Sequence, residues 1–281
     1  MNILLLGSNG AIGSNFLKLY LNKRKINKIY SLDVNKNVLI KKKLIKNNKH
    51  IFIKHDLEKG SEIKINKINY FDCAIFLSFN TQFKNYEEYE YYIKNMKIFY
   101  NSLEIIRKLK IKKVVYASSF AVYGDLTSKK LNEKSKRKKV DIYSELKIEC
   151  ENLIERLSIN NFNFRILRFS QVFGKDIYTN IIANFLNMKR NNKTVTLFGN
   201  GLQYRDFISI EDVCEAIMKA TLLKSKKNYI LNICSGKMFS ILSIVKIIGL
   251  NYILKKDLRG PKKVIGSNLL AKKTLNWKPK I

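Results

Sequence analysis

Three glycines follow the first apolar run of the chain. Residues 4–15 read LLLGSNGAIGSN, which places Gly7, Gly10 and Gly13 directly after the run 3–6 and at the start of a segment with helical spacing. Glycine lets the backbone turn tightly and approach a pyrophosphate, whose negative charge is favoured at the N-terminus of a helix. The spacing is GxxGxxG rather than the GxGxxG of the older fingerprint. We therefore expect a strand, a glycine turn and a helix that bind a dinucleotide.

Acidic residues follow the next two apolar runs. Asp33 ends the second run, 20 residues after Gly13, where a carboxylate can accept hydrogen bonds from the hydroxyls of the adenosine ribose. A carboxylate there repels a 2′-phosphate and no arginine lies beside it, so the sequence favours NAD over NADP. Asp56 and Leu57 follow the third run, at a suitable distance for contact with the adenine ring. The alternative is a structural glycine turn with an incidental aspartate.

Short apolar runs alternate with helical stretches through the first half of the chain. This alternation is typical of a parallel sheet that helices cover on both faces. We expect strands at 3–6, 29–33, 51–53, 73–77, 114–117 and 164–167, with helices at 11–23, at 86–110 and around Tyr143. In the helix 86–110, one apolar face is expected from Tyr89, Ile93, Met96, Tyr100, Leu103 and Ile106.

The pattern becomes less regular after Phe169. A helix is expected at 180–190, a strand at 194–198 and a helix at 210–223. The predicted fold class is α/β, a Rossmann-type doubly wound parallel sheet with a smaller C-terminal substrate-binding lobe. Residues 1–170 are expected to form the NAD-binding domain and residues 171–281 the smaller lobe, with the two lobes interleaved.

The net charge of +32 comes mostly from lysine, which supplies 45 of the 54 basic residues. A genome poor in G and C favours lysine codons everywhere, and the densest basic cluster, residues 134–139, has no interleaved aromatic residues for base stacking. We expect a solvated basic face and no specific nucleic-acid binding.

The chain also carries no feature of a membrane or secreted protein. It has no run of about 20 apolar residues, so no membrane span is expected. Its four cysteines lack CxxC spacing, which indicates buried free thiols in a reducing compartment and gives no pattern for a metal site. We expect a cytoplasmic protein.

The segment 141–150, DIYSELKIEC, places Tyr143 and Lys147 on one face of a helix. A free phenol ionises near pH ~10, and a nearby ammonium together with the positive nicotinamide of NAD⁺ lowers that pKa. The pair alone is weak, because a chain with 15 tyrosines and 45 lysines produces several such spacings by chance. Ser119 ends the fifth apolar run, 24 residues before Tyr143, and its hydroxyl either shares the substrate proton or caps the strand.

These motifs, in this order, resemble the extended short-chain dehydrogenases, chiefly nucleotide-sugar epimerases and dehydratases, over nearly the whole chain. The segments that carry the resemblance are GSNGAIGS, HDL, DCAIFLSF, the pair Asn95 and Asn101, SSFAVYG, YSELK, ILRFSQVFG, GNGLQYRDFISIEDV, NICSGKMFSI and LNWKP. The resemblance implies that Tyr143 is the general acid/base, Lys147 its electrostatic partner and Ser119 a hydroxyl relay. The residues expected at the cofactor are Gly7, Gly10, Ala11, Ile12, Gly13, Asp33, Asp56, Leu57, Leu77, Asn95, Tyr143 and Lys147. Those expected at a nucleoside-diphosphate sugar are Ser119, Gln171, Arg205 and Arg259.

The chain also departs from the pattern of this family. Gln171 stands where most relatives have asparagine, and Phe76 replaces a histidine after the fourth strand. The segment 174–198 and the C-terminus are shorter than in typical epimerases, which suggests a trimmed sugar pocket. Dehydratases of this family carry Asp and Glu at the positions of Phe120 and Ala121, and decarboxylases usually keep a Glu at the position of Ala121. Because neither acid is present here, both reactions are disfavoured.

The expected activity is NAD-dependent epimerisation at C4 of a nucleoside-diphosphate hexose through a transient 4-keto sugar. One alternative is an NAD(P)H-dependent reductase of an NDP-4-keto-deoxysugar. An alternative of another class is a non-catalytic nucleotide-fold protein that binds RNA or a protein partner. The resemblance also implies a homodimer through the helices at 86–110 and around Tyr143.

Overall fold

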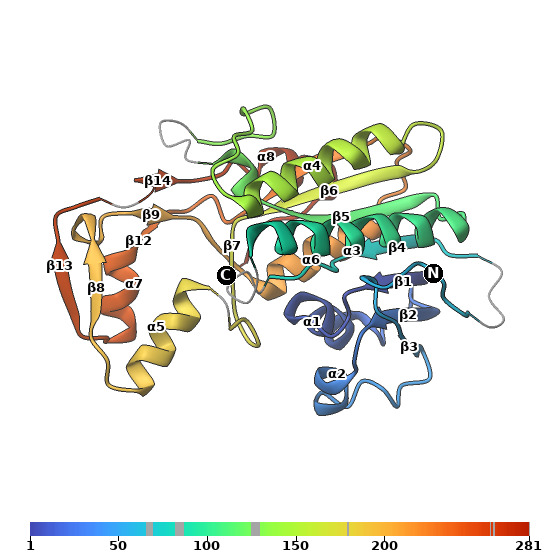
Figure 1. Ribbon diagram of the computed structural model, residues 1–281, viewed down its shortest axis with the longest axis horizontal. Helices are drawn as coiled ribbons and strands as arrows, with labels where there is room; N and C mark the ends of the chain where they lie inside the picture. The colour runs from blue at the N-terminus through green and yellow to red at the C-terminus, as the bar shows by residue number, and fades with distance from the viewer. Residues whose placement is uncertain are drawn as a thin grey trace.

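Seven parallel strands form the central sheet of the protein (Figure 1). The computed structural model describes residues 1–65, 70–81, 87–124, 130–178, 180–258, 260 and 262–280. In spatial order the strands are β11 (Tyr229–Ile233), β6 (Asn163–Phe169), β5 (Lys113–Ser119), β4 (Cys73–Phe76), β1 (Asn2–Leu6), β2 (Lys28–Asp33) and β3 (His50–Lys54). The strand order reverses between β1 and β4, and ligands of such sheets bind at the carboxyl ends of the strands at this point.

Helices cover both faces of the sheet, as expected for strands buried on both sides. One face packs against α1 (Ala11–Tyr20), α6 (Ile210–Leu222) and α8 (Leu269–Leu275), with Phe16 and Trp277 in the shared core. The other packs against α3 (Glu88–Lys108) and α4 (Ile142–Leu157), with Phe99 and Leu146 in the core. The short helix α2 (Asn37–Lys41) follows β2. The predicted Rossmann-type class is confirmed.

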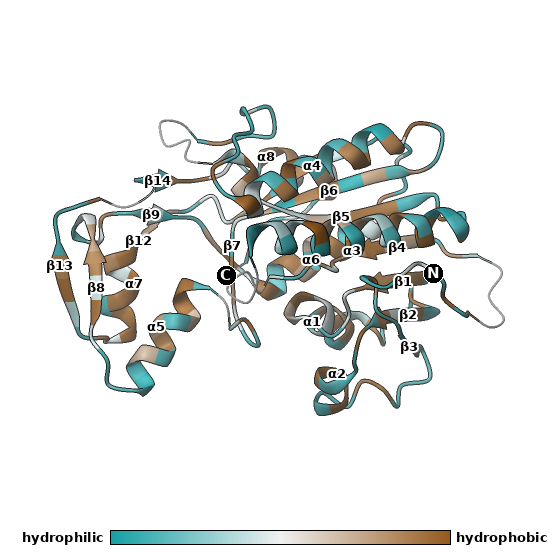
Figure 2. Ribbon diagram, viewed as in Figure 1, coloured by the Kyte–Doolittle hydropathy of each residue, from teal (hydrophilic) through white to brown (hydrophobic). Residues whose placement is uncertain are grey.

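The smaller lobe extends to the left of the sheet in Figure 1. Its elements are β7 (Gln171–Phe173), α5 (Ile181–Arg190), β8 (Val195–Phe198), β9 (Tyr204–Arg205), β10 (Phe207–Ser209), β12 (Phe239–Ser240), α7 (Ile241–Ile248), β13 (Tyr252–Lys255) and β14 (Lys263–Val264). It has its own core, in which Phe185 of α5 and Val245 of α7 are buried. Figure 2 shows the hydrophobic colour along β8 and α7, where this core lies.

The two lobes share elements along the chain. β11 and α6 lie beyond residue 170 and yet belong to the central sheet and its helical cover. A single boundary at residue 170 therefore does not separate the two lobes in space, although most of the smaller lobe follows it in the sequence. The division into 1–170 and 171–281 stays a proposal.

The helix α3 forms where it was expected, but its buried face was predicted wrongly in part. Tyr89 and Tyr100 are 76% and 49% exposed, whereas Tyr91 and Phe99 are buried. Aromatic residues one or two positions apart lie on different faces of one helix, and only the packing of the helix against the sheet decides which of them is buried. Among the described residues, no helix combines the length and apolar character needed to cross a membrane. All four cysteines are buried free thiols, as expected.

Candidate active site

Two cavities lie along the carboxyl ends of the strands. A cavity of about 570 Å³ is lined by the glycine turn after β1 and by residues that follow β2, β3 and β4. A second cavity of about 580 Å³ is lined by the end of β5, the start of α4 and residues of the smaller lobe. The segments after β1, β2, β3 and β4 therefore form the first cavity, and β5, α4 and the smaller lobe form the second.

The glycine turn between β1 and α1 leaves no room for side chains at two positions. Gly7 has a φ of +84°, and a Cβ there would lie 2.7 Å from the backbone nitrogen of Ser78. A Cβ on Gly13 would lie 2.3 Å from the carbonyl oxygen of Gly7. Gly10 precedes α1 and supplies no side chain to cap its first amides, which suits an anionic ligand. The turn fits the pyrophosphate of a dinucleotide.

Asp33 lies at the first cavity, as predicted. Its carboxylate accepts hydrogen bonds from the backbone nitrogens of Asn9 and Val34, both at 2.8 Å. Burial raises the pKa of Asp33, and these backbone hydrogen bonds act in the opposite direction. Asp56 and Leu57 line the same cavity. The residues present therefore fit NAD: an amide-rich turn for the phosphates, a carboxylate for the ribose and an apolar contact for adenine.

Two asparagines of α3 hold the walls of this cavity. Asn95 is 1% exposed, and its side-chain oxygen accepts a hydrogen bond from the backbone nitrogen of Asn80 at 2.9 Å. Asn101 donates to the carbonyl oxygen of Leu57 at 2.7 Å. Asn80 and Leu57 line the cavity, whereas Asn95 does not. Cofactor binding by Asn95 stays a prediction, and any such effect is expected to act through Asn80.

The remaining predicted cofactor residues lie around the glycine turn. Leu77 extends β4 through a hydrogen bond from its nitrogen to the carbonyl oxygen of Leu6 at 3.0 Å, and it lines the first cavity. Ile12 lines the second cavity, and Ala11 lines a third, adjacent one beside α2.

Ser119, Tyr143 and Lys147 meet at the second cavity. A capping box starts α4, in which Asp141 accepts a hydrogen bond from the nitrogen of Ser144 at 2.7 Å, and Tyr143 therefore lies in the first turn. The side chains of Tyr143 and Ser119 both line the cavity, and the Ser119 hydroxyl acts to lower the pKa of Tyr143. Ser119 also caps a short 3₁₀ helix, Phe120–Tyr123, through the nitrogen of Ala121 at 3.1 Å. The two interpretations of Ser119 are thus compatible.

Lys147 is 4% exposed and points into the protein beside the tyrosine. Its ammonium donates to the carbonyl oxygen of Ala117 at 3.0 Å and lies 5.9 Å from the centre of the Tyr143 ring. Burial lowers the pKa of Lys147 to about 8, although Cys150 and Glu151 act to raise it.

The pKa of Tyr143 was predicted to be lowered, but the chain without its cofactor raises it, so this prediction was wrong. Burial raises the pKa of Tyr143, and only the hydrogen bond with Ser119 acts to lower it. The prediction treated the lysine as a close ion, whereas the Lys147 ammonium lies beside the ring and bonds a backbone carbonyl. A phenol near its ordinary or a higher pKa is a proton donor at neutral pH.

Phe79 is a site residue that the sequence analysis did not single out. Its ring lies 4.0 Å from the Lys147 ammonium and makes an edge contact with the Tyr143 ring, with centres 5.5 Å apart. It is the last residue of the segment DCAIFLSF, which was identified only as a family landmark. Phe76 of the same segment is 1% exposed and packs against Phe99 and Tyr116 in the core.

The substrate residues lie on the smaller-lobe side of the second cavity. Gln171 at the start of β7 and Arg205 at the end of β9 both line it. Arg205 is held between β12 and β14, and its neighbour Asp206 accepts three hydrogen bonds from Ser235 and Gly236 at 2.8–2.9 Å. Arg259 lies outside the described residues.

The basic cluster 134–139 is only partly a solvated face. Arg137 forms ion pairs with Glu151 and Glu155 at 3.1 and 3.4 Å, and Lys139 lies 2.6 Å from Glu145. These cations are therefore neutralised within the protein, which weakens the case for a nucleic-acid surface here.

Fold and site together define a dinucleotide-dependent enzyme of the short-chain dehydrogenase class. The profile of the NAD dependent epimerase/dehydratase family matches residues 3–234, and the chain belongs to this family. This membership confirms the resemblance drawn from the sequence, the status of the chain as an enzyme and NAD as its cofactor.

Individual relatives are similar over most of the chain. A Methanocaldococcus jannaschii protein named "Putative UDP-glucose 4-epimerase" is 28% identical over 85% of this chain and 88% of its own length. The bifunctional polymyxin resistance protein ArnA of Wigglesworthia glossinidia brevipalpis is 29% identical over 99% of this chain, which spans only 49% of ArnA. The crystal structure of UDP-glucuronic acid 4-epimerase from Bacillus cereus with UDP-glucuronic acid and NAD superposes with a TM-score of 0.84 at 23% identity, covering 100% of this chain and 95% of the other.

Proposed function

We propose that the protein epimerises a nucleoside-diphosphate hexose at C4 with NAD as its cofactor. The observation that carries the proposal is that the hydroxyl-bearing side chains of Ser119 and Tyr143 line the same cavity as Arg205. A guanidinium can bind a diphosphate through paired hydrogen bonds, and Arg205 lines the same cavity as the two hydroxyls. The cavity of about 580 Å³ has the size of a small-molecule site.

The residues of the chain supply the proton chemistry. NAD, held by the glycine turn and Asp33, would supply the acceptor and later the donor of the C4 hydride. Tyr143, as the phenolate, would accept the proton of the C4 hydroxyl beside the Ser119 hydroxyl as a 4-keto sugar forms. Burial raises the pKa of Tyr143 in the chain alone, so the phenolate depends on the positive charges of the Lys147 ammonium and of the bound nicotinamide. After the keto sugar turns over in the cavity, Tyr143 returns the proton and the epimer is complete.

One feature of the site argues against dehydration, and the relatives favour an epimerase over a reductase. Phe120 and Ala121 line the cavity, and neither offers a carboxylate for dehydration. A reductase of an NDP-4-keto-deoxysugar uses the same three residues once and consumes reduced cofactor. The relatives with epimerase names, which include a UDP-glucose 4-epimerase from Thermotoga maritima, support the epimerase. A non-catalytic protein has no need of the complete Ser–Tyr–Lys arrangement.

The test is incubation with a panel of UDP-, dTDP-, GDP- and CDP-hexoses, with separation of the products and measurement of absorbance by the reduced nicotinamide. The proposal expects one nucleotide sugar to convert to its C4 epimer without net change in reduced cofactor. Stoichiometric oxidation of NADH or NADPH with a 4-keto substrate identifies the reductase instead. No turnover of any sugar, together with nanomolar RNA binding that weakens steeply with salt, supports the binding protein.

We further propose that the protein is a homodimer through α3 and α4. A groove of about 510 Å³ runs between these helices, lined by Tyr100, Arg107 and Leu157 among others. Tyr100 and Leu157 are 49% and 38% exposed although both are apolar over most of their surface. Light scattering is expected to give twice the chain mass for the wild type and for Ile159→Asp, which lies outside the groove, and the chain mass for Leu157→Asp.

A further inference from the structure

A buried ion pair joins the catalytic helix to the central sheet. Glu151 of α4 is 0% exposed and Arg168 of β6 is 1% exposed. The Nε and Nη2 atoms of Arg168 donate to the two carboxylate oxygens of Glu151 at 2.9 and 2.6 Å. Tyr143, Lys147 and Glu151 follow one another at four-residue steps, so the pair lies two turns from the catalytic phenol.

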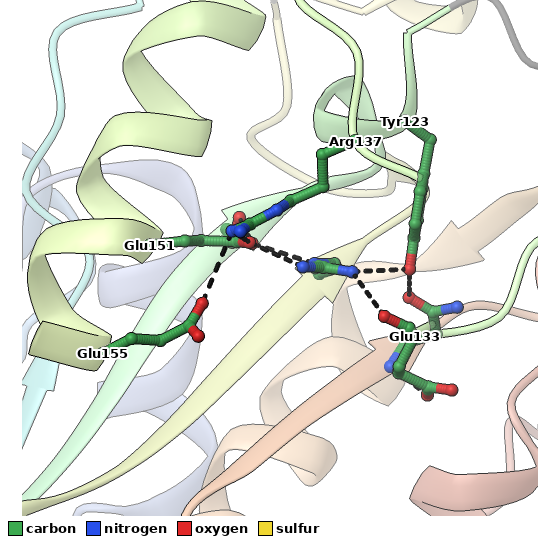
Figure 3. Close-up of polar contacts among 8 residues, drawn as sticks. Tyr123, Glu133, Arg137, Glu151 and Glu155 are labelled. Carbon is green, nitrogen blue, oxygen red and sulfur yellow. Dashed lines mark hydrogen bonds and ion pairs between the residues drawn. The ribbon is translucent and has the colours of Figure 1, made fainter. Parts of the chain in front are cut away.

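Glu151 accepts two further hydrogen bonds. Ser118 of β5 donates to its Oε1 atom at 2.5 Å, and Arg137 donates to its Oε2 atom at 3.1 Å. Figure 3 shows Glu151 and Glu155 projecting from α4 toward Arg137. Each carboxylate oxygen of Glu151 thus has two donors, and its direction is fixed.

Arg168 makes two further hydrogen bonds beyond its ion pair with Glu151. Its Nη1 atom donates to the hydroxyl of Tyr123 at 2.9 Å and to the carbonyl oxygen of Glu133 at 3.3 Å. Tyr123 in turn donates to the side chain of Asn232 of β11 at 2.7 Å (Figure 3). Three elements, α4, β5 and β6, therefore meet at one guanidinium and its carboxylate, and β11 is connected to them through Tyr123.

Ser119 lies between two anchored residues of this network. Ser118 immediately before it is bonded to Glu151, and Tyr123 four residues later is bonded to Arg168. The Ser119 backbone pairs with Phe169 of β6, and its side chain accepts a hydrogen bond from the nitrogen of Ala121 within this segment. The pair Glu151–Arg168 therefore connects the segment that carries one catalytic hydroxyl to the helix that carries the other.

We propose that Glu151 and Arg168 are positioning residues that set the separation of the Ser119 and Tyr143 hydroxyls. The inference rests on the proposed function of these two hydroxyls. The pair by itself is weak evidence for a role in stability, because apolar residues of similar volume often replace buried ion pairs without loss. Directed hydrogen bonds explain the pair, since a guanidinium fork fixes the angle as well as the distance. Only nine of the 54 basic residues are arginine, and two of them converge on Glu151.

The first test compares Glu151→Gln with Glu155→Gln. Both residues lie on α4 and both contact Arg137, but within the described residues Glu155 makes no recorded contact with Arg168 or Ser118. A displacement of about 1 Å at reacting groups costs about a hundredfold in rate. Glu151→Gln is expected to lower kcat by about 10- to 100-fold with less than about a threefold change in KM. Glu155→Gln is expected to keep kcat within about twofold. Equal effects of the two changes overturn the proposal.

The second test does not depend on whether Glu151→Gln folds. Ser118→Ala removes one hydroxyl from the network and leaves the ion pair in place. If Ser118 acts through Ser119, Ser118→Ala lowers kcat by about tenfold in the wild type and by less than about twofold in Ser119→Ala. A purely structural role for Ser118 lowers kcat by the same factor in both backgrounds, and that additive result contradicts the proposal.

Crystal structures keep the inference testable if the wild type turns over no sugar, a result that refutes the proposed function alone. The oxygen–oxygen separation of Ser119 and Tyr143 is then compared between the wild type and Ser118→Ala. An increase of about 0.5 Å or more is expected, since catalytic groups need placement within that margin. An unchanged separation refutes the positioning role.

Discussion

The ammonium of Lys147 lies 4.0 Å from the centre of the Phe79 ring and 5.1 Å from the centre of the Tyr116 ring. A buried cation between two aromatic rings gains some energy from their negative faces, but it loses its hydration. The low pKa of about 8 indicates that the loss of hydration is the larger effect. Lys147 is thus kept at a cost to stability, which is common for functional residues.

Replacement of this lysine should stabilise the protein. The pKa of Lys147 is about 8 in the folded state and ~10.4 in the unfolded chain, so the cost is complete below pH ~8 and disappears as the pH rises above ~10. Lys147→Met is expected to raise the free energy of unfolding by about 1–2 kcal/mol at pH 7, with a gain that shrinks toward pH ~10. Urea unfolding at both pH values measures this gain. The exposed Lys97 of α3 offers a control, Lys97→Met, with little change at either pH. A destabilised Lys147→Met at pH 7 contradicts the prediction.

Removal of the Tyr143 hydroxyl should abolish most of the turnover. General acid/base groups contribute about 10²–10⁴-fold to a rate, and Tyr143→Phe is expected to lose a factor in this range. Its binding of NAD, measured by quenching of protein fluorescence, is expected to remain within about threefold, because the ring is kept. Tyr89→Phe is the matched control, since Tyr89 is 76% exposed. Tyr143→Phe with turnover within about twofold of the wild type rules out the catalytic assignment.

The glycine turn should tolerate a methyl group at one position and not at another. A Cβ on Gly13 would lie 2.3 Å from a backbone oxygen, whereas a Cβ on Gly10 would lie 3.5 Å from the same oxygen. Gly13→Ala is expected to cost more than about 2 kcal/mol of unfolding free energy, and Gly10→Ala less than about 1 kcal/mol. Thermal and urea unfolding without added cofactor measure both. Similar costs for the two changes would show that the backbone relaxes freely here.

A lysine of the α2 region ties α1 to the segment after β7. Lys42 lies 2.7 Å from Asp176 and donates to the hydroxyl of Ser14 at 2.9 Å, with side-chain exposures of 12% and 19% for the ion pair. Burial alone raises the pKa of Asp176, but the hydrogen bond and charge of Lys42 bring it below its ordinary value. The stabilisation is therefore present above pH ~4 and lost as the pH falls below it.

Removal of this tie should destabilise the protein in a pH-dependent way. Lys42→Met is expected to cost about 0.5–1 kcal/mol at pH 7 and little near pH 3. The neighbouring Lys41 is exposed, and Lys41→Met is expected to change stability by less than about 0.3 kcal/mol. Unfolding curves at the two pH values measure the difference. A cost of Lys42→Met that persists at pH 3 assigns the effect to packing instead of the ion pair.

The predicted site residues that the structure brings together have a local cause. Gly7 and Gly13 were predicted to form a tight turn, because a turn that brings the backbone close to a ligand leaves no room for side chains. In the structure, backbone atoms lie within 3 Å of where their Cβ atoms would be. Tyr143 and Lys147 were predicted because a helix fixes which residues share a face. The central sheet followed from uninterrupted apolar runs such as Cys73–Phe76.

The residues that the sequence did not reveal depend on contacts between distant segments. The position of Phe79 against Lys147, and that of Arg137 against Glu151, follow from packing that no local pattern encodes. The pKa of Tyr143 was predicted in the wrong direction because burial, which outweighs the other effects, is a property of the folded chain. The short strands of the smaller lobe, such as β9 with two residues, leave no periodic pattern to detect.

The place of β11 at the edge of the central sheet has a consequence for synthesis on the ribosome. Until Tyr229–Ile233 emerges, the outer edge of β6 has no partner, and an open edge of an apolar strand invites pairing with other chains. Trp277 delays completion further, since it is 1% exposed and donates to the carbonyl oxygen of Asp212 at 3.1 Å. Prematurely terminated products are therefore expected to aggregate or to recruit chaperones instead of accumulating as a free nucleotide-binding domain.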